Sequence, residues 1–319
     1  MREHREVARG LLALSRIAAL GLIAALFAAG ANAQPVERPK AFCNGAFVGG
    51  AEGIIEGCTA YIVENPQRTP SLARAYTWRG IAYEDLGESD RAIEDLSQAI
   101  SIEPSVSAFN ARGNAYSRKG DYERALSDYE SALSIKRDAF PLMGMIRVYR
   151  RQEQYDLALQ AIEEVMELWS RQDPVLHLIR GHVHRDSGQF EKSLQDFEKA
   201  IELAPRFESF RSDRCVALAL LGKAEEGFGD CNRAIEKGPE AATNFLNRGA
   251  VYLRLNRPDE AAADFERAFD VDPDDPEALY ARGVGRRLKG DTAGGDADIA
   301  SAKARAPKVG RRLETMGIK

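Results

Sequence analysis

The chain has 319 residues, of which 44% are hydrophobic and 29% charged, and its formal net charge is −5. That composition is sufficient for a folded protein with a sizeable buried core. A mildly acidic balance argues against nonspecific nucleic-acid binding, which relies on an excess of lysine and arginine. No nucleic-acid partner is therefore expected.

Residues 1–33 have the pattern of a secretory signal peptide. A basic start is followed by the apolar run 17–29 and by Ala-Asn-Ala at 31–33, the small residues expected before a cleavage site. We predict cleavage before Gln34, export of the remaining chain and no stable membrane insertion afterwards. The alternative is an uncleaved anchor in the inner membrane, with the rest of the chain facing the periplasm.

Residues 34–71 are predicted to form an N-terminal capping hairpin. Ile54, Cys58, Tyr61 and Pro66 reproduce the spacing found in the second half of each repeated unit further along the chain. A partial unit at this place would cover the first face of a stack, because a stack of repeats needs a cap at its end.

A dipeptide of arginine and a small residue recurs every 33 to 35 residues, with the degenerate Met145-Ile146 at the third place. Its second position is occupied in turn by Gly80, Gly113, Ile146, Gly181, Cys215, Gly249 and Gly283. Apolar or small residues recur 12, 16 and 19 positions later, which is the spacing of one helix face. Turn residues such as Gly120 and Asp121 separate the two stretches of each unit. A period of this length indicates one helical hairpin stacked seven times.

The units are predicted to follow one another without a break. Their expected bounds are 72–105, 106–138, 139–173, 174–207, 208–241, 242–275 and 276–307. Residues 308–319 carry Val309, Leu313 and Met316 at helical spacing, and we expect them to cap the exposed end of the last unit.

The repeated segments resemble a known family. RGIAYEDLGESDRAIEDLSQAI at 79–100 and RGNAYSRKGDYERALSDYESAL at 112–133 look like tetratricopeptide repeats, and the resemblance extends over 72–307. It implies an all-α fold, an α–α superhelix of seven helix-turn-helix repeats with an N-terminal half-repeat cap and a C-terminal capping helix. Together with the style of the signal segment, it points to an exported bacterial protein of the periplasm.

An aspartate follows the repeat arginine by 16 residues in every unit except the third. The pairs are Arg79/Asp95, Arg112/Asp128, Arg180/Asp196, Arg214/Asp230, Arg248/Asp264 and Arg282/Asp298. The third unit has Met145 and Ala161 instead, so both partners are lost together. This joint loss favours a contact between the two helices, within a unit or across to the next, over two independent surface preferences. We predict structural ion pairs, because guanidinium and carboxylate match as a two-pronged hydrogen-bonding pair.

All four cysteines follow the signal segment. By repeat position, Cys215 takes the small-residue place of a first helix and Cys231 the large-residue place of the second, so the two should face each other. Cys43 and Cys58 have a similar spacing in the N-terminal hairpin. In an oxidising compartment we predict the disulfides Cys43–Cys58 and Cys215–Cys231, with buried free thiols as the alternative.

The sequence holds no recognisable catalytic, metal-binding or cofactor-binding motif. His182 and His184 are two residues apart and point to different sides of a helix. No nucleophile elbow, glycine-rich phosphate loop or zinc-protease motif occurs in the sequence. We therefore predict a non-enzymatic protein without cofactor or metal.

In the tetratricopeptide repeat family, the first helices line a concave groove. By that resemblance, a mostly basic set of residues lies near the middle of the groove. The predicted binding residues are Asn114, Arg118, Arg147, Arg150, Arg151 and Arg185. Arginines suit carboxylates, so the expected partner is an acidic peptide or a C-terminal carboxylate, while a solvated arginine-rich face is the alternative.

The predicted function is a periplasmic scaffold that binds a protein or peptide in this groove. The alternative is a structural subunit of a cell-envelope assembly or of a secretion machinery, in which the repeats associate with one another.

Overall fold

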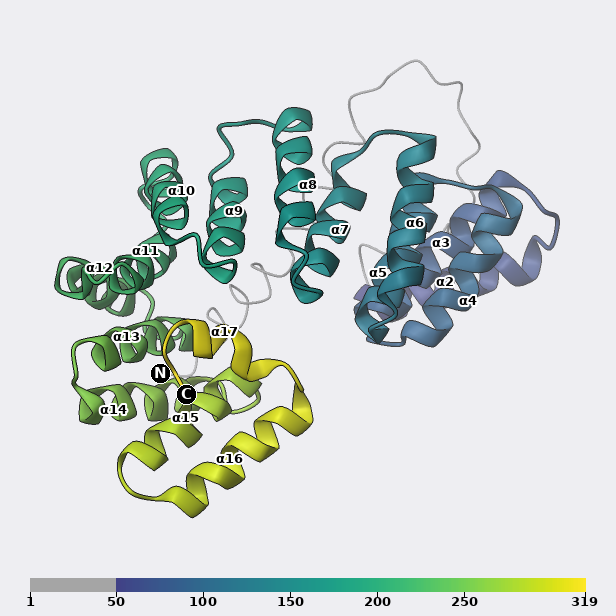
Figure 1. Ribbon diagram of the computed structural model, residues 1–319. Coiled ribbons are helices and arrows are strands. Elements are labelled where there is room, and N and C mark those ends of the chain that lie inside the picture. The colour runs from purple at the N-terminus through teal and green to yellow at the C-terminus, as the bar shows by residue number, and fades with distance from the viewer. Residues whose placement is uncertain (1–49) are drawn as a thin grey trace.

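The computed structural model describes residues 50–319, which form sixteen α-helices and no strand. The predicted signal segment, most of the expected first half of the N-terminal hairpin and Cys43 lie outside the described residues. Antiparallel helix pairs follow one another side by side along a curved ribbon (Figure 1). The predicted all-α superhelix of seven helical hairpins is confirmed.

The helices alternate between two roles in the hairpins. The first helices are α3 (Pro70–Asp85), α5 (Val106–Lys119), α7 (Ala139–Arg151), α9 (Pro174–Asp186), α11 (Ser209–Leu220), α13 (Ala242–Arg254) and α15 (Pro276–Leu288). The second helices are α4 (Ser89–Ile102), α6 (Tyr122–Ile135), α8 (Tyr155–Leu168), α10 (Phe190–Leu203), α12 (Ala224–Lys237), α14 (Pro258–Val271) and α16 (Thr292–Arg305). One helix precedes the pairs, α2 (Gly50–Glu64), and one follows them, α17 (Val309–Thr315).

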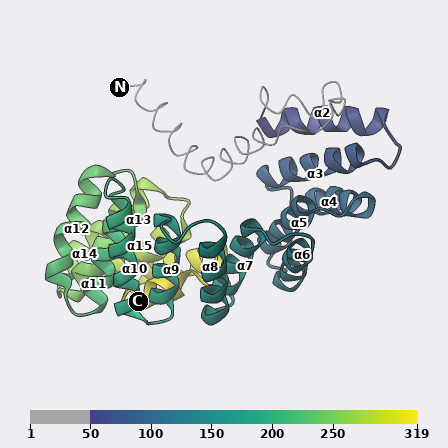
Figure 2. The same cartoon turned by 90° about the horizontal axis from the view of Figure 1, so that it is seen from above.

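Seen from above, the ribbon curls along its length (Figure 2). Helices α2 to α6 form one end, α7 and α8 lie in the middle, and the later helices gather at the other end. None of the described helices is both long and apolar enough to cross a membrane.

Each hairpin turn passes through a left-handed backbone conformation. Glycine occupies this place in five turns, as at Gly120, which ends α5 with φ of 81°. The third and sixth turns use Glu153 and Asn256, with φ of 64° and 55°. Asparagine tolerates this region, whereas glutamate is strained in it by about 1–2 kcal/mol. The next helix is then capped, for example by Asp121, whose carboxylate accepts the Arg124 backbone N–H.

Small residues on the first helix let a large side chain of the second helix lie against the backbone. At Gly249, an added Cβ atom would come within 2.3 Å of the Phe265 ring. Phe265 is fully buried. The contact between the two helices of this repeat therefore depends on the absence of a side chain at Gly249.

We predict that Gly249→Ala lowers the free energy of unfolding by about 1–3 kcal/mol, because the methyl group forces the Phe265 ring from its site. Gly229→Ala is the matched control, since Gly229 lies in α12 with no atom within 4 Å of an added Cβ. The control should be neutral or stabilising, because alanine favours a helix. Urea unfolding of both variants checks the difference, and equal stability would contradict the packing argument.

Helix α17 lies within the curve of the ribbon, beside α13 and α15 (Figure 1). Val309, Leu313, Met316 and Ile318 are buried in one apolar cluster with residues of α11, α13 and α15. The C-terminal segment therefore covers several first helices on the inner side of the superhelix.

Candidate partner-binding groove

All six arginine–aspartate pairs are in contact in the structure. In the second repeat, Arg112 donates from Nε and Nη2 to the two carboxylate oxygens of Asp128, at 2.9 and 2.8 Å. The hydrogen bond to Asp128 raises the pKa of Arg112 above its ordinary value. Both Nε and Nη2 also reach the carboxylate in the pairs Arg79–Asp95, Arg180–Asp196, Arg248–Asp264 and Arg282–Asp298. In the remaining pair, Arg214 donates through Nε to Asp230 at 2.6 Å.

The aspartates of these pairs lie inside the stack and are closed to solvent. Five of them are buried, with exposed fractions between 4% and 8%: Asp95, Asp128, Asp196, Asp264 and Asp298. Asp230 of the fifth repeat is only partly buried. The alternative of independent surface preferences is therefore wrong for these residues. Asp95, Asp264 and Asp298 are structural joints between helices, and a partner in solution has no access to their carboxylates.

Four of these arginines, Arg79, Arg112, Arg180 and Arg248, also reach the helix that precedes their own repeat. Arg112 donates from Nη1 to Ser97 Oγ at 3.0 Å, and Arg248 donates from Nη1 to Asn232 Oδ1 at 3.0 Å. One guanidinium thus joins three helices, two of its own repeat and one of the repeat before. The spacing of 16 residues was sufficient to predict the aspartate partner. The partner in the preceding unit differs in residue type between repeats, as Ser97 and Asn232 do, so the sequence did not predict it.

We predict that Asp128→Ala lowers the free energy of unfolding by about 3 kcal/mol, because it leaves the guanidinium of Arg112 without its buried counterion. The double variant Arg112→Met with Asp128→Ala should be more stable than Asp128→Ala alone. The third repeat carries a similar combination, Met145 and Ala161. Thermal unfolding of both single variants and the double variant gives the coupling energy, and purely additive losses would exclude a coupled pair.

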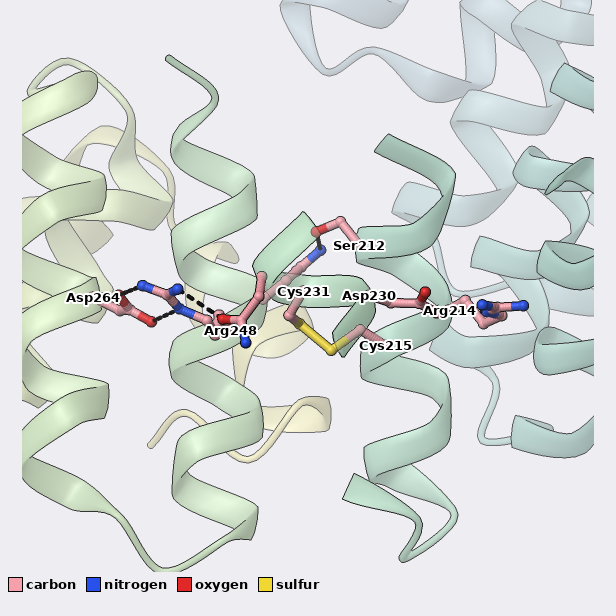
Figure 3. The surroundings of a disulfide bond; sticks show 9 residues. Ser212, Arg214, Cys215, Asp230, Cys231, Arg248 and Asp264 are labelled. Carbon is pink, nitrogen blue, oxygen red and sulfur yellow. Dashed lines mark hydrogen bonds and ion pairs between the residues drawn. A yellow bond between two sulfur atoms is a disulfide. The ribbon is translucent and has the colours of Figure 1, made fainter. Parts of the chain in front are cut away.

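The predicted disulfide between Cys215 and Cys231 is present and joins α11 to α12, with Cα atoms 5.7 Å apart (Figure 3). Both residues are fully buried. The bond takes the place of the contact between glycine and a large side chain that other repeats use. Cys58 is also buried and disulfide-bonded, while its predicted partner Cys43 lies outside the described residues.

Two of the predicted groove arginines are held by aspartates of the same chain. Arg150 lies 2.9 Å and Arg185 3.1 Å from the carboxylate of Asp186. Asp213 adds a second negative charge, 3.6 Å from Arg185 and 3.0 Å from His182 Nε2. The side chain of Arg185 is only 2% exposed. Arg150 and Arg185 therefore belong to an internal charge network, which the interpretation of a basic cluster overlooked.

Burial alone would raise the pKa of Asp213, but the charge and hydrogen bond of His182 and the charge of Arg185 lower it below the ordinary value. Asp213 remains a carboxylate inside the groove. Asp213 could have been noticed by comparing the repeats. It stands two residues before Cys215, and the equivalent position of every other repeat carries no acidic residue.

The other predicted groove residues lie toward the N-terminal end of this network. Arg118 forms an ion pair with Glu84 at 3.0 Å, and its side chain is 53% exposed. Arg147 donates to Asn114 Oδ1 at 2.6 Å and is exposed. Arg151 is exposed at the end of α7. The structure thus brings Asn114 and Arg147 together and leaves Arg147 and Arg151 facing solvent.

The C-terminal segment lies against the first helices further along the superhelix. Arg312 donates from Nε to Glu277 Oε1 at 2.8 Å, and Lys308 Nζ donates to the backbone carbonyl of Arg151 at 3.1 Å. Arg311 forms an ion pair with Glu153. Residues at the end of the chain are therefore in contact with the turn between α7 and α8.

The histidines are distributed over two faces of α9. His182 faces Asp213 in the groove, whereas His184 Nε2 lies 3.7 Å from Asp196 between the helices of the repeat. Burial lowers the pKa of His184, which favours its neutral form. Within residues 50–319, no group of three histidine, cysteine, aspartate or glutamate side chains is arranged to hold a metal ion.

A curved stack of antiparallel helix pairs defines a helical-repeat protein. Family models described as tetratricopeptide repeat match 73–106, 106–138, 174–207 and 246–306, which together make up about half of the chain. The chain belongs to the tetratricopeptide repeat family. No curated protein matches its sequence.

Solved structures share the fold at low sequence identity. A tetratricopeptide repeat protein from Parabacteroides merdae is 19% identical with a TM-score of 0.65, and the match covers 79% of this chain and 97% of that one. The C-terminal part of a repeat protein from Cytophaga hutchinsonii is 19% identical with a TM-score of 0.53, covering 76% and 98%. A chain of the Cut9–Hcn1 hetero-tetramer of the APC/C is 14% identical with a TM-score of 0.57, covering 82% and 48%.

Proposed function

We propose that this protein is an exported, non-enzymatic scaffold that binds a protein or peptide in the concave groove of its superhelix. The tetratricopeptide repeat fold supports a role in protein–protein interaction. Stacked hairpins present a long concave surface, and such surfaces hold partners rather than perform chemistry. The proposed site for an acidic segment is the groove along α5 and α7.

The exposed arginines of α7 carry this proposal. Arg147 is held in place by Asn114, whose side-chain oxygen also accepts the Tyr129 hydroxyl at 2.9 Å. Among residues 50–319, no carboxylate forms an ion pair with Arg147 or Arg151. Arg118 adds a further positive charge nearby but shares it with Glu84. A carboxylate of a bound peptide would supply the counterion that Arg147 and Arg151 lack.

We predict that the chain binds acidic peptides with a free C-terminus more tightly than amidated or neutral ones. The double variant Arg147→Ala with Arg151→Ala should lose about tenfold or more in affinity at low salt, because charge-assisted hydrogen bonds are lost. Fluorescence anisotropy with labelled eight-residue peptides at low and high salt measures both effects.

Arg150→Ala is the matched control, since Arg150 is already bound to Asp186 and should contribute little to the peptide. Unchanged affinity in the double variant, or equal binding of acidic and neutral peptides, would retire the acidic-partner proposal.

The proposed compartment is the periplasm. Two observations support it: the signal pattern of 1–33 and the disulfide Cys215–Cys231, a bond typical of oxidising compartments. We expect the protein, expressed in a Gram-negative host, to appear in the periplasmic fraction with Gln34 as its first residue. Fractionation and N-terminal sequencing check this. An intact chain in the membrane fraction would favour the anchored alternative.

The alternative function is a structural subunit of a cell-envelope assembly or secretion machinery. Exposed apolar side chains near the ends of α7, α8 and α9 favour it: Phe140, Trp169 and Val175 are 43%, 47% and 50% exposed. Phe140 and Trp169 pack edge to face with ring centroids 5.7 Å apart. Self-association through these residues would distinguish a structural subunit from a monomeric scaffold.

A further inference from the structure

The C-terminal segment 308–319 occupies the inner side of the superhelix as a ligand would. Leu313 and Ile318 are 0% exposed, and Met316 is 1% exposed. These side chains share one apolar cluster with Val216 of α11, Leu246 of α13, and Leu279, Tyr280 and Val284 of α15. The apolar cluster that includes the segment extends over three successive repeats, and α17 itself packs mainly against α15.

A single arginine carries the central polar contact of the segment. Arg312 binds the carboxylate of Glu277, and its side chain is 23% exposed. Burial alone would lower the pKa of Arg312, but the hydrogen bond to Glu277 and the negative charges of Glu277, Asp186 and Asp213 raise it. Arg312 thus supplies the positive charge opposite Glu277, whereas Asp186 and Asp213 are also shared with Arg150, Arg185 and His182.

The outer contacts of the segment lie near the solvent. Lys308 binds the backbone carbonyl of Arg151, and Arg311 pairs with Glu153 with its own side chain 59% exposed. Glu153 is the glutamate held in the left-handed conformation. Exposed ion pairs contribute about 0–1 kcal/mol each. These contacts therefore orient the segment but add little to the free energy that holds it in place.

The helical part of the segment has seven residues. A helix of that length is not stable alone in water, so the segment keeps its shape only while it remains in the groove. Release would expose the part of this apolar cluster that the segment covers, including Tyr280, together with the carboxylate of Glu277. An apolar centre with polar groups around it is the usual composition of a protein-binding site, and an arginine of the partner is a frequent anchor in such sites.

We propose that the C-terminal part of the groove is a second binding surface, and that 308–319 is an internal ligand which a partner helix displaces. This rests on the proposed function of the groove. The partner segment carries an arginine or lysine and apolar side chains at the spacing of Arg312, Leu313, Met316 and Ile318. It is basic, in contrast to the acidic segment proposed for Arg147 and Arg151.

The geometry favours a different protein over a second copy of this chain. Helix α16 ends at Arg305 and α17 begins at Val309, so three residues connect them. Three residues span about 10 Å when extended. A segment tethered so closely reaches its own groove and hardly that of another copy.

The test uses a fluorescein-labelled synthetic peptide of residues 306–319, APKVGRRLETMGIK. Wild-type chain should bind it weakly, because the attached segment competes at a high effective concentration. The full-length variant Arg312→Glu places a negative charge beside Glu277, Asp186 and Asp213 and should release its own segment. We expect it to bind the peptide about tenfold tighter, or more, than the wild-type chain does.

Two controls make the result specific. Lys289→Glu is the same change of charge on an exposed side chain at the end of α15 and should bind as the wild type does. A peptide carrying Arg312→Glu should bind none of the chains. Circular dichroism verifies that each variant is folded, and Met316→Ala provides a second way to weaken the segment if Arg312→Glu does not fold.

The outcomes separate the alternatives. If folded Arg312→Glu and Met316→Ala bind the peptide no tighter than the wild type and only melt earlier, 308–319 is a stabilising cap and the proposal fails. If light scattering shows concentration-dependent dimers of the wild-type chain, the occupant is a second copy and the proposal also fails. The proposal for Arg147 and Arg151 is tested with acidic peptides, whereas this test uses the 306–319 peptide. If the acidic peptides do not bind, the result of this test is unaffected.

Discussion

The repeat arginine connects a helical hairpin to the hairpin before it. Its guanidinium binds the aspartate of its own second helix and, in four repeats, also a polar side chain of the preceding helix, as Arg112 does with Asp128 and Ser97. A helical hairpin cannot bury both of its faces alone, so stability requires this contact between neighbours.

The third repeat shows what happens where the joint is missing. Met145 and Ala161 replace the charged pair, and both side chains are buried with the apolar residues of α7 and α8. Gly144 lies against the Tyr129 ring, whose hydroxyl binds Asn114. An apolar contact thus substitutes for an ion pair, as is often possible in protein interiors. The exposed Arg147 lies on α7. The proposed carboxylate-binding arginine therefore belongs to the repeat in which apolar residues replace the ion pair.

Most of the fold could be predicted from the sequence because each repeat depends on local spacing. The interval of 16 residues was sufficient to pair Arg112 with Asp128 and Cys215 with Cys231. The groove could be predicted only in part. Arg185 is neutralised by its neighbour Asp186 together with Asp213 of the next repeat, and the position of Arg312 depends on curvature summed over several repeats. Such contacts between distant residues arise from small rotations that no single repeat encodes.

The contact between Lys308 and Arg151 joins residues 157 positions apart and has a mechanical consequence. A helical-repeat ribbon normally stretches and recoils like a spring, since each unit touches only its neighbours. Here the C-terminal segment also contacts the turn between α7 and α8, so α7 to α17 form a closed loop of contacts. Helices α2 to α6 extend from it (Figure 1). Loss of the buried contacts of this segment would let α7 to α17 extend, so the final twelve residues set the stiffness of that part of the ribbon.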